Sequence, residues 1–315
     1  RSRLGRSPPV TDQRQRVERA VERSAERLRE RAPSLAARVI PWTNARWPSG
    51  RAADYFLQPD RFPFLLLPEW ARRTIGAEPD REFEQDLVHS SVNGYWFVRL
   101  LDDAMDEPDL VDPALLPALA FFHAEFQSPY HRWFASGHPF WEEFDAAWAG
   151  AADAVSADAG RRDVDRAEFE AVAARKMAAA RIPLAAVLHR QGRLDLSPAW
   201  GDVCDRLARF EQLFDDVIDW SRDLRRGGST WFLTEARRRS APAESVTGWV
   251  AREGLEWGMS TLREWIADAR TRAEEIGSAD LIAHLERREA AAMERSDVLA
   301  RGLLALRQIA DHVPR

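Results

Sequence analysis

Two segments rich in aspartate, each following a run of apolar residues, most constrain what this chain can fold into. The first is Asp102–Glu107, which follows Tyr95–Leu101, and the second is Asp215–Asp223, which follows Phe210–Phe214. Carboxylates are rarely buried without a partner, and an uncompensated buried charge is expensive. Acidic residues on helices that also face a core therefore predict bound cations. Mg²⁺ is the natural candidate, because it binds through a few carboxylates together with substrate phosphates.

The composition is that of a soluble globular protein, with 45% apolar and 30% charged residues. A net charge of −6 argues against nucleic acid as the main partner. No apolar run approaches the roughly 20 residues that cross a bilayer, and none follows the first positive charges, so we expect neither a transmembrane segment nor a secretory signal. Cys204 is the only cysteine, which excludes an internal disulfide and a cysteine-based zinc site. A cytoplasmic location is expected.

Helical periodicity dominates the chain, and strand signals are nearly absent. The pattern predicts an exposed amphipathic helix over 11–39, an irregular connection over 41–68, and then helices separated by Gly- and Pro-rich breaks at roughly 80–105, 113–127, 139–155, 163–192, 198–224, 242–274 and 278–309. We expect an all-α protein with a disordered lead-in over residues 1–10. The remainder, residues 11–315, is expected to form a single-domain helical bundle.

In the first acidic segment, Asp102 and Asp106 are four residues apart and therefore share a helix face. The preceding turns place Tyr95, Val98 and Arg99 close to this face, and we expect them to line a pocket for a ligand with a charged head and an apolar tail. The alternative is a solvated acidic helix end, because a proline follows at once and the helix must stop there.

In the second acidic segment, Asp215, Asp219 and Asp223 form a line of three carboxylates at positions i, i+4 and i+8. Unpaired, they would repel one another by some tenths of a kcal/mol per pair, and a cation would remove that penalty. The alternative is a salt-bridged surface helix, but it leaves the apolar residues between the acids unexplained. The basic residues beside the line are candidates for binding an anion: Arg222, Arg225 and Arg226.

A third candidate is the basic pair Arg175 and Lys176 in an Ala-rich stretch upstream of the second acidic segment. Metal on one side and arginine on the other are what a diphosphate requires. Taken alone, this pair is equally compatible with a plain solvated basic patch.

Together these segments resemble the class I isoprenoid synthase superfamily, which comprises terpene cyclases, trans-prenyl diphosphate synthases and squalene/phytoene synthase relatives. Leu101–Glu107 is similar to the first aspartate-rich motif of that superfamily. Phe210–Asp219 is similar to the FQxxDDxxD segment of prenyl diphosphate synthases. The line of acids up to Asp223, with a basic residue before the last acid, is similar to the NSE/DTE triad of cyclases. The resemblance covers about residues 80–235.

The resemblance implies a helical bundle of the class I terpenoid synthase type with a central active-site cavity and three Mg²⁺ ions. It implies five metal ligands, of which the first, second and fourth would be essential for catalysis: Asp102, Asp106, Asp215, Asp219 and Asp223. Arg222 would touch the substrate diphosphate, with Arg175 or Lys176 as an upstream sensor. Gln212 is expected to line the pocket, and a homodimer is expected by analogy.

Departures from the family pattern bear on the reaction. Prenyl-elongating enzymes have an Arg-Arg pair shortly after the first motif, whereas Pro108–Pro113 of this chain contains no arginine. The N-terminal Gly-Lys-Arg anchor of those enzymes is also missing. The C-terminal Arg-Tyr pair of bacterial cyclases is missing as well. We expect an Mg²⁺-dependent terpene synthase that converts a linear prenyl diphosphate, from farnesyl to geranylfarnesyl, into a hydrocarbon or alcohol and releases pyrophosphate. The alternatives are a prenyltransferase that joins two substrates and a non-catalytic helical binding protein.

Overall fold

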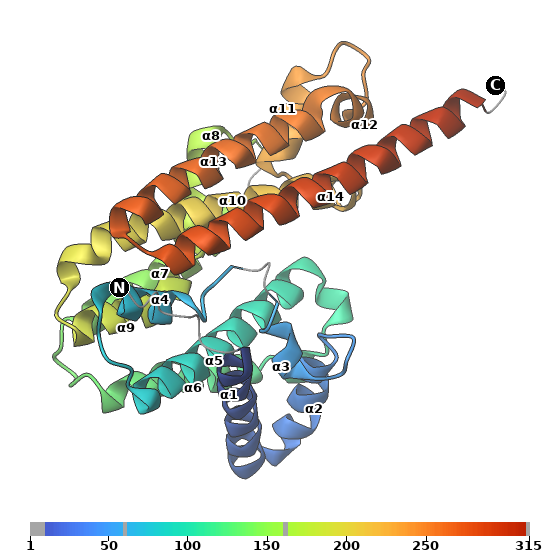
Figure 1. Ribbon diagram of the computed structural model, residues 1–315. Helices are drawn as coiled ribbons and strands as arrows, with labels where there is room; N and C mark the ends of the chain where they lie inside the picture. Colours follow the sequence, from blue (N-terminus) through green and yellow to red (C-terminus); the bar gives the residue numbers. More distant parts are fainter. Residues whose placement is uncertain (1–9, 59–61, 160–162, 313–315) are drawn as a thin grey trace. The chain divides into compact units, whose positions relative to one another are not determined.

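The computed structural model describes residues 10–58, 62–159 and 163–312, and every regular element in these ranges is a helix (Figure 1). The predicted all-α class is therefore confirmed. Of the lead-in predicted over residues 1–10, only Val10 is described, and it begins the first helix. No helix in these ranges is long and apolar enough to span a membrane.

The chain divides into two compact units, which we describe separately. Unit 1 comprises Arg1–Phe144 and Ala180–Leu194, and unit 2 comprises Asp145–Ala179 and Asp195–Arg315. That residues 11–315 form one domain stays a prediction.

Unit 1 contains the helices of the first part of the chain and one helix from later in the chain, α9 (Ile182–Arg190). They are α1 (Val10–Arg31), α2 (Pro33–Asn44), α3 (Ala52–Tyr55), α4 (Leu67–Ile75), α5 (Arg81–Asp106), the 3₁₀ turns η1 (Pro108–Leu110) and η2 (Pro113–Leu115), α6 (Ala118–Gln127), η3 (Ser128–Arg132) and α9.

The helices of unit 2 come from the second part of the chain, and α7 (Phe140–Asp158) contains the boundary between the units. They are α8 (Arg166–Lys176), α10 (Ser197–Arg225), α11 (Trp231–Arg239), α12 (Val246–Trp249), the π-helical turn η6 (Val250–Gly254), α13 (Leu255–Ile276) and α14 (Ala279–His312). The short 3₁₀ turns η4 (Ala178–Arg181) and η5 (Leu194–Leu196) lie where the chain changes units.

The long helix α5 is the centre of unit 1. It starts where the Asp80 side chain accepts a hydrogen bond from the backbone N–H of Phe83 at 3.1 Å, an N-cap that satisfies one of the free donors of the first turn. It packs closely against α6, because a Cβ atom at Gly94 would lie only 2.7 Å from Cδ2 of Phe126. Pro108 follows its last turn and excludes further helix.

Helix α1 is attached to unit 1 by buried ion pairs. Three of its arginines, at helical spacing, each bind a buried carboxylate: Arg16 with Glu84 at 2.8 Å, Arg23 with Asp86 at 2.8 Å, and Arg27 with Glu125 at 2.6 Å. The three arginines are seven and four residues apart, so they lie on the same face of α1. The pairs favour one register of α1 on α5 and α6, because a shift by one residue would separate all three of them at once.

In unit 2, α10, α13 and α14 are the long helices, and α13 packs along both others (Figure 1). A Cβ atom at Gly258 of α13 would lie 2.6 Å from Cγ2 of Val217 on α10, so the glycine permits the close approach of these two backbones. Helix α10 ends at a turn in which Gly227 has φ +71° and the N–H of Gly228 donates to the carbonyl of Asp223 at 2.8 Å.

Two predicted segments differ from the helices observed, and the observed helices α4 and α11 lie outside the predicted helical ranges. The helix expected over 11–39 is broken at Ala32, whose φ of −148° is extended because proline follows it. The segment 163–192 contains two helices separated by a 3₁₀ turn. Helix α11 falls outside every predicted range, since Trp231, Phe232 and Leu233 form an apolar run too short to show a helical period.

Loss of the Glu125 charge is expected to destabilise unit 1. Burial tends to raise the pKa of this carboxyl, but hydrogen bonds from His89 and Arg27 outweigh it and the pKa is lowered. Glu125→Gln should reduce the free energy of unfolding by about 2–4 kcal/mol at pH 7, because partly buried cations lose their partner. The deficit should be fully present above about pH 4.5, the ordinary pKa of Glu, where the unfolded chain begins to bind the proton, and it should be lost as pH falls through the lower pKa of the folded protein.

The measurement is urea unfolding followed by circular dichroism. The control is Glu22→Gln, which removes an exposed pair with Arg29 on α1 and should change stability by less than about 0.5 kcal/mol. Equal effects of the two substitutions would contradict the role given to the buried pair.

Candidate functional site

The acid row of α10, defined as Asp215, Asp219 and Asp223, lies along one face of the helix as predicted, with one turn between successive carboxylates. Asp215 is exposed and the other two are partly exposed. Arg222 joins those two, with Nη2 2.5 Å from Oδ2 of Asp219 and Nε 3.9 Å from Oδ1 of Asp223. The predicted anion-binding arginine therefore neutralises two of the predicted metal ligands.

The apolar residues between these acids lie on the other side of α10. Leu213, Phe214, Val217 and Trp220 are buried in the structure. Because Val217 packs closely against Gly258 of α13, the rotation of α10 about its axis is fixed by packing. The orientation of the acid row is thus set by the core of unit 2 and does not depend on the acids themselves.

Asp216 differs from its neighbour Asp215 because it points into unit 2. It is only 4% exposed and accepts a hydrogen bond from Nε2 of Gln212 at 3.1 Å. Burial raises the pKa of the Asp216 carboxyl to about 8, and the bond from Gln212 opposes this only in part. Asp216 is therefore turned away from the acid row and engaged within unit 2.

A small cavity of about 50 Å³ adjoins Asp216, large enough for one or two water molecules. Gln212, predicted to line a pocket, lines this one, together with Lys176, Thr230 and Trp231. The sequence patterns did not indicate Thr230 or Trp231, because they enter the cavity from a different element, at the start of α11.

The predicted basic pair lies at the end of α8 and binds acids of α7. Arg175 forms an exposed ion pair with Asp153 at 2.5 Å, and Lys176 forms a less exposed ion pair with Asp158. Lys176 is the only lysine of a chain with 45 basic residues of the Lys and Arg types. Its ammonium group lies close enough to Asp216 to favour the ionised form of that carboxyl.

Arg225 and Arg226 are exposed at the C-terminal end of α10. There they complement the negative end of the helix dipole. Arg237 reaches the same turn from α11, with its Nη2 3.5 Å from the carbonyl oxygen of Gly228. The turn after α10 is therefore basic, and whether it binds a diphosphate stays a prediction.

The predicted acidic pair of unit 1 lies in the last turn and a half of α5. Asp102 is partly exposed and Asp106, the last residue of the helix, is exposed. Asp103 between them is held by two arginines, with Nη2 of Arg46 at 2.6 Å and Nη2 of Arg99 at 2.8 Å. Arg99, expected to line a pocket, is thus a partner of Asp103.

The two other residues expected to line a pocket beside α5 lie in different surroundings. Val98 is exposed. The ring of Tyr95 belongs to an aromatic cluster of unit 1, with centroids 4.8 Å from Tyr55, 5.3 Å from Phe56 and 5.9 Å from Phe64. Their contact with a substrate stays a prediction.

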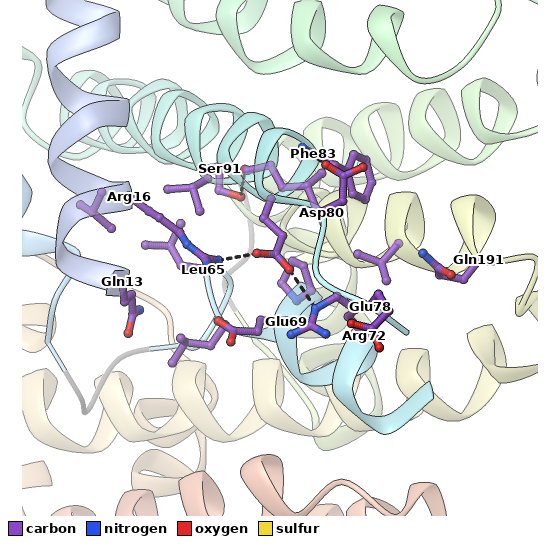
Figure 2. Close-up of a pocket in the computed structure, with 17 residues that line it drawn as sticks. Gln13, Arg16, Leu65, Glu69, Arg72, Glu78, Asp80, Phe83, Ser91 and Gln191 are labelled. Atoms are coloured by element: carbon purple, nitrogen blue, oxygen red, sulfur yellow. Dashed lines mark hydrogen bonds and ion pairs between the residues drawn. The ribbon is translucent and has the colours of Figure 1, made fainter. Parts of the chain in front are cut away.

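A further pocket in unit 1 was not indicated by any sequence pattern (Figure 2). Figure 2 shows Arg16 and Arg72 each joined by a dashed line to the same carboxylate. The ion pairs identify it as that of Glu84, and both measure 2.8 Å. The cavity has a volume of about 30 Å³ and is otherwise largely apolar, with Leu65 and Phe83 in its wall. Its charged residues come from α1, α4, α5 and the connection between α4 and α5, so no local pattern could have predicted them.

The five predicted metal ligands lie on two helices that belong to different units. Asp102 and Asp106 are on α5 of unit 1, and the acid row is on α10 of unit 2. Across the described ranges, no group of three or more His, Cys, Asp or Glu side chains is arranged to hold a metal ion. The Mg²⁺ ligands remain a prediction.

Comparison with known proteins gives a likeness in fold. The sequence matches no family model and no curated protein. Among solved structures, it is similar to a geranylgeranyl pyrophosphate synthetase from the archaeon Geoglobus acetivorans, with a TM-score of 0.63, 15% identity, and coverage of 91% of this chain and 98% of that one. The likeness confirms the expected helical fold of the isoprenoid synthase type.

The buried Asp216 carboxyl should leave a signature in the pH dependence of stability. With a pKa of about 8 in the folded protein and 3.8 as its ordinary value, it holds a proton in the native state that the unfolded chain has lost. The free energy of unfolding should therefore fall as pH rises from 4 to 8, by at most about 1.4 kcal/mol per pH unit from this group. Asp216→Asn should remove that part of the decline.

Urea unfolding at pH 5, 7 and 8.5 in Mg²⁺-free buffer measures this difference. The matched control is Asp215→Asn, one residue away on the exposed side of α10, which should keep the pH dependence of the parent. If Asp216→Asn and the parent lost stability in parallel, the buried carboxyl would have an ordinary pKa.

Proposed function

We propose that this chain is an Mg²⁺-dependent enzyme that ionises a prenyl diphosphate and belongs to the class I isoprenoid synthase superfamily. The observation that carries the proposal is the fold, which is similar over 91% of the chain to that of a geranylgeranyl pyrophosphate synthetase. In this fold, α10 bears three carboxylates at one-turn spacing, and α5 bears a second pair. A binding protein with the same helices would have no need for this repeated spacing.

The donor chemistry of both acidic segments fits Mg²⁺, which prefers carboxylate oxygens and retains room for phosphate oxygens. We propose Asp102 and Asp106 of α5, and the acid row of α10, as Mg²⁺ ligands. These carboxylates are exposed or partly exposed, so a cation from solvent can reach them. Bound Mg²⁺ would supply positive charge that stabilises the diphosphate as a leaving group.

The basic residues of unit 2 would bind the diphosphate oxygens. Arg222 is 53% exposed and forms ion pairs with Asp219 and Asp223. When those carboxylates bind a cation, its guanidinium becomes available to an anion, and a guanidinium can bind two oxygens at once. Lys176, a single lysine in an arginine-rich chain, would contribute a compact point charge.

Within this reaction class we propose a terpene synthase that acts on one substrate, of farnesyl to geranylfarnesyl length. The segment Pro108–Pro113 after the first acidic segment contains no arginine to bind a second diphosphate. The second candidate is a prenyltransferase, favoured by the activity that the name of the structural neighbour states. The two differ in whether product forms from one prenyl diphosphate alone.

The test is incubation of the chain with Mg²⁺ and geranyl, farnesyl, geranylgeranyl or geranylfarnesyl diphosphate, each with and without isopentenyl diphosphate. Gas chromatography detects hydrocarbons and alcohols, and a coupled assay detects pyrophosphate. A hydrocarbon or alcohol from one substrate alone is expected. A longer diphosphate formed only with isopentenyl diphosphate would assign the chain as a prenyltransferase, and no turnover in any reaction would contradict the proposal.

Substitution of one carboxylate from each helix should abolish turnover. Asp102→Asn and Asp219→Asn are expected to lower kcat by about 100-fold or more, the usual loss when one electrostatic stabiliser of a leaving group is removed. The control is Asp202→Asn, also on α10 but paired with Arg206 and Arg272, which should keep the parent rate. Retention of a rate within a few-fold of the parent by either first variant would argue against the assigned roles.

A further inference from the structure

Arg288 of α14 is buried against the helix that carries the acid row. Its side chain is 3% exposed and forms a two-pronged ion pair with Glu211, whose side chain is 17% exposed. Nε donates to Oε1 at 2.8 Å and Nη2 donates to Oε2. The guanidinium carbon lies 5.3 Å from the ring centroids of both Phe210 and Phe214. This arrangement holds the charge in one place, since pairing and stacking act on the same planar group.

Glu211 lies one helical turn before Asp215, so it continues the acid row in the N-terminal direction. Four carboxylates therefore occupy positions i, i+4, i+8 and i+12 of α10. An arginine binds the row at each end, but in different ways. Arg222 is 53% exposed and binds Asp219 and Asp223 from the same helix, whereas Arg288 is buried and comes from another.

We propose that Arg288 is a positioning residue for metal binding, and that it acts by neutralising Glu211. The pair excludes the first carboxylate of the series from the metal site and leaves Asp215, Asp219 and Asp223 as the ligands. This inference rests on the proposed function, because it concerns the Mg²⁺ that those residues would hold.

The physical reason is the cost of an unpaired carboxylate beside the row. Without Arg288, the largely buried charge of Glu211 would lack its partner, a strongly unfavourable state. It would also repel Asp215 one turn away. A divalent cation bound by Glu211 and Asp215 would relieve both effects, but one turn away from the ligand set proposed for catalysis.

A different result is expected if Arg288 has a purely structural role. If the pair served only to attach α14 to α10, removing both partners would disturb the metal site as much as removing Arg288. If Arg288 acts through the charge of Glu211, removing both charges should restore metal binding. The double variant Glu211→Gln/Arg288→Gln therefore separates the two roles.

The experiment measures the melting temperature of the full chain and its variants during titration with MgCl₂ alone, inorganic pyrophosphate alone, and both. For the parent we expect stabilisation by Mg²⁺ together with pyrophosphate. Arg288→Gln should melt lower, respond to Mg²⁺ alone, and need about 10- to 100-fold more Mg²⁺ for the response to pyrophosphate, the usual effect of losing a residue that supports metal ligands. The double variant should recover the parent midpoint.

Two further variants keep the test decisive. Arg287→Gln changes the exposed neighbouring arginine on α14 and should match the parent in every titration. Arg288→Lys keeps the charge but loses the two-pronged geometry, so it should melt lower with the Mg²⁺ midpoint of the parent. If Arg288→Gln does not fold, Arg288→Lys and the double variant carry the comparison, since both leave no unpaired carboxylate.

The outcomes distinguish this inference from the proposed function. A parent that shows no response to Mg²⁺ with pyrophosphate would contradict the proposed function and this inference with it. A parent that responds, with Arg288→Gln at the same midpoint, would overturn the inference alone. Equal weakening in Arg288→Gln and the double variant would also overturn it, because Arg288 would then act as an attachment point only.

Discussion

The pairing of arginine with carboxylate is the interaction on which both units depend. Arginines from other elements meet the buried Glu84, Asp86 and Glu125 of unit 1 and the largely buried Glu211 of unit 2, as Arg27 meets Glu125 and Arg288 meets Glu211. The buried Asp216 differs, because it accepts a hydrogen bond from Gln212. A buried ion pair adds little to stability compared with apolar residues, but it penalises every alternative arrangement that would separate the charges. These pairs therefore set which helix faces meet, while the aromatic and aliphatic core supplies most of the favourable free energy.

This division of roles explains how an acidic row can be part of a stable helix. The side of α10 that carries Val217 is held by α13, whose Gly258 removes the Cβ atom that would collide with it. Packing thus fixes the rotation of α10, and the carboxylates on its other side need not contribute to stability. Repulsion within the row is limited by Arg222 and relieved further by any bound cation. The row can be maintained for binding because the fold does not depend on it.

Local patterns in the sequence predicted the elements that bear the site, because helix periodicity and shared faces are properties of neighbouring residues. Helix α10 was expected over 198–224 and spans Ser197–Arg225, with the acid row on one face. The break before Pro33 and helix α11 were missed, since capping and a short apolar run give weak periodic signals. The Glu211–Arg288 pair could not have been predicted, because it joins residues of different helices that no local spacing connects.

Each acidic segment contains two adjacent aspartates, and the structure separates their roles in the same way. Successive residues of a helix point about 100° apart, so only one of two neighbours can face a given surface. Asp103 is held by two arginines within unit 1, and Asp216 is buried and hydrogen-bonded by Gln212 within unit 2. The first aspartate of each pair instead shares its face with an acid one turn later. The second aspartate of each pair is thus engaged within its own unit, and the first is the one we expect to bind metal.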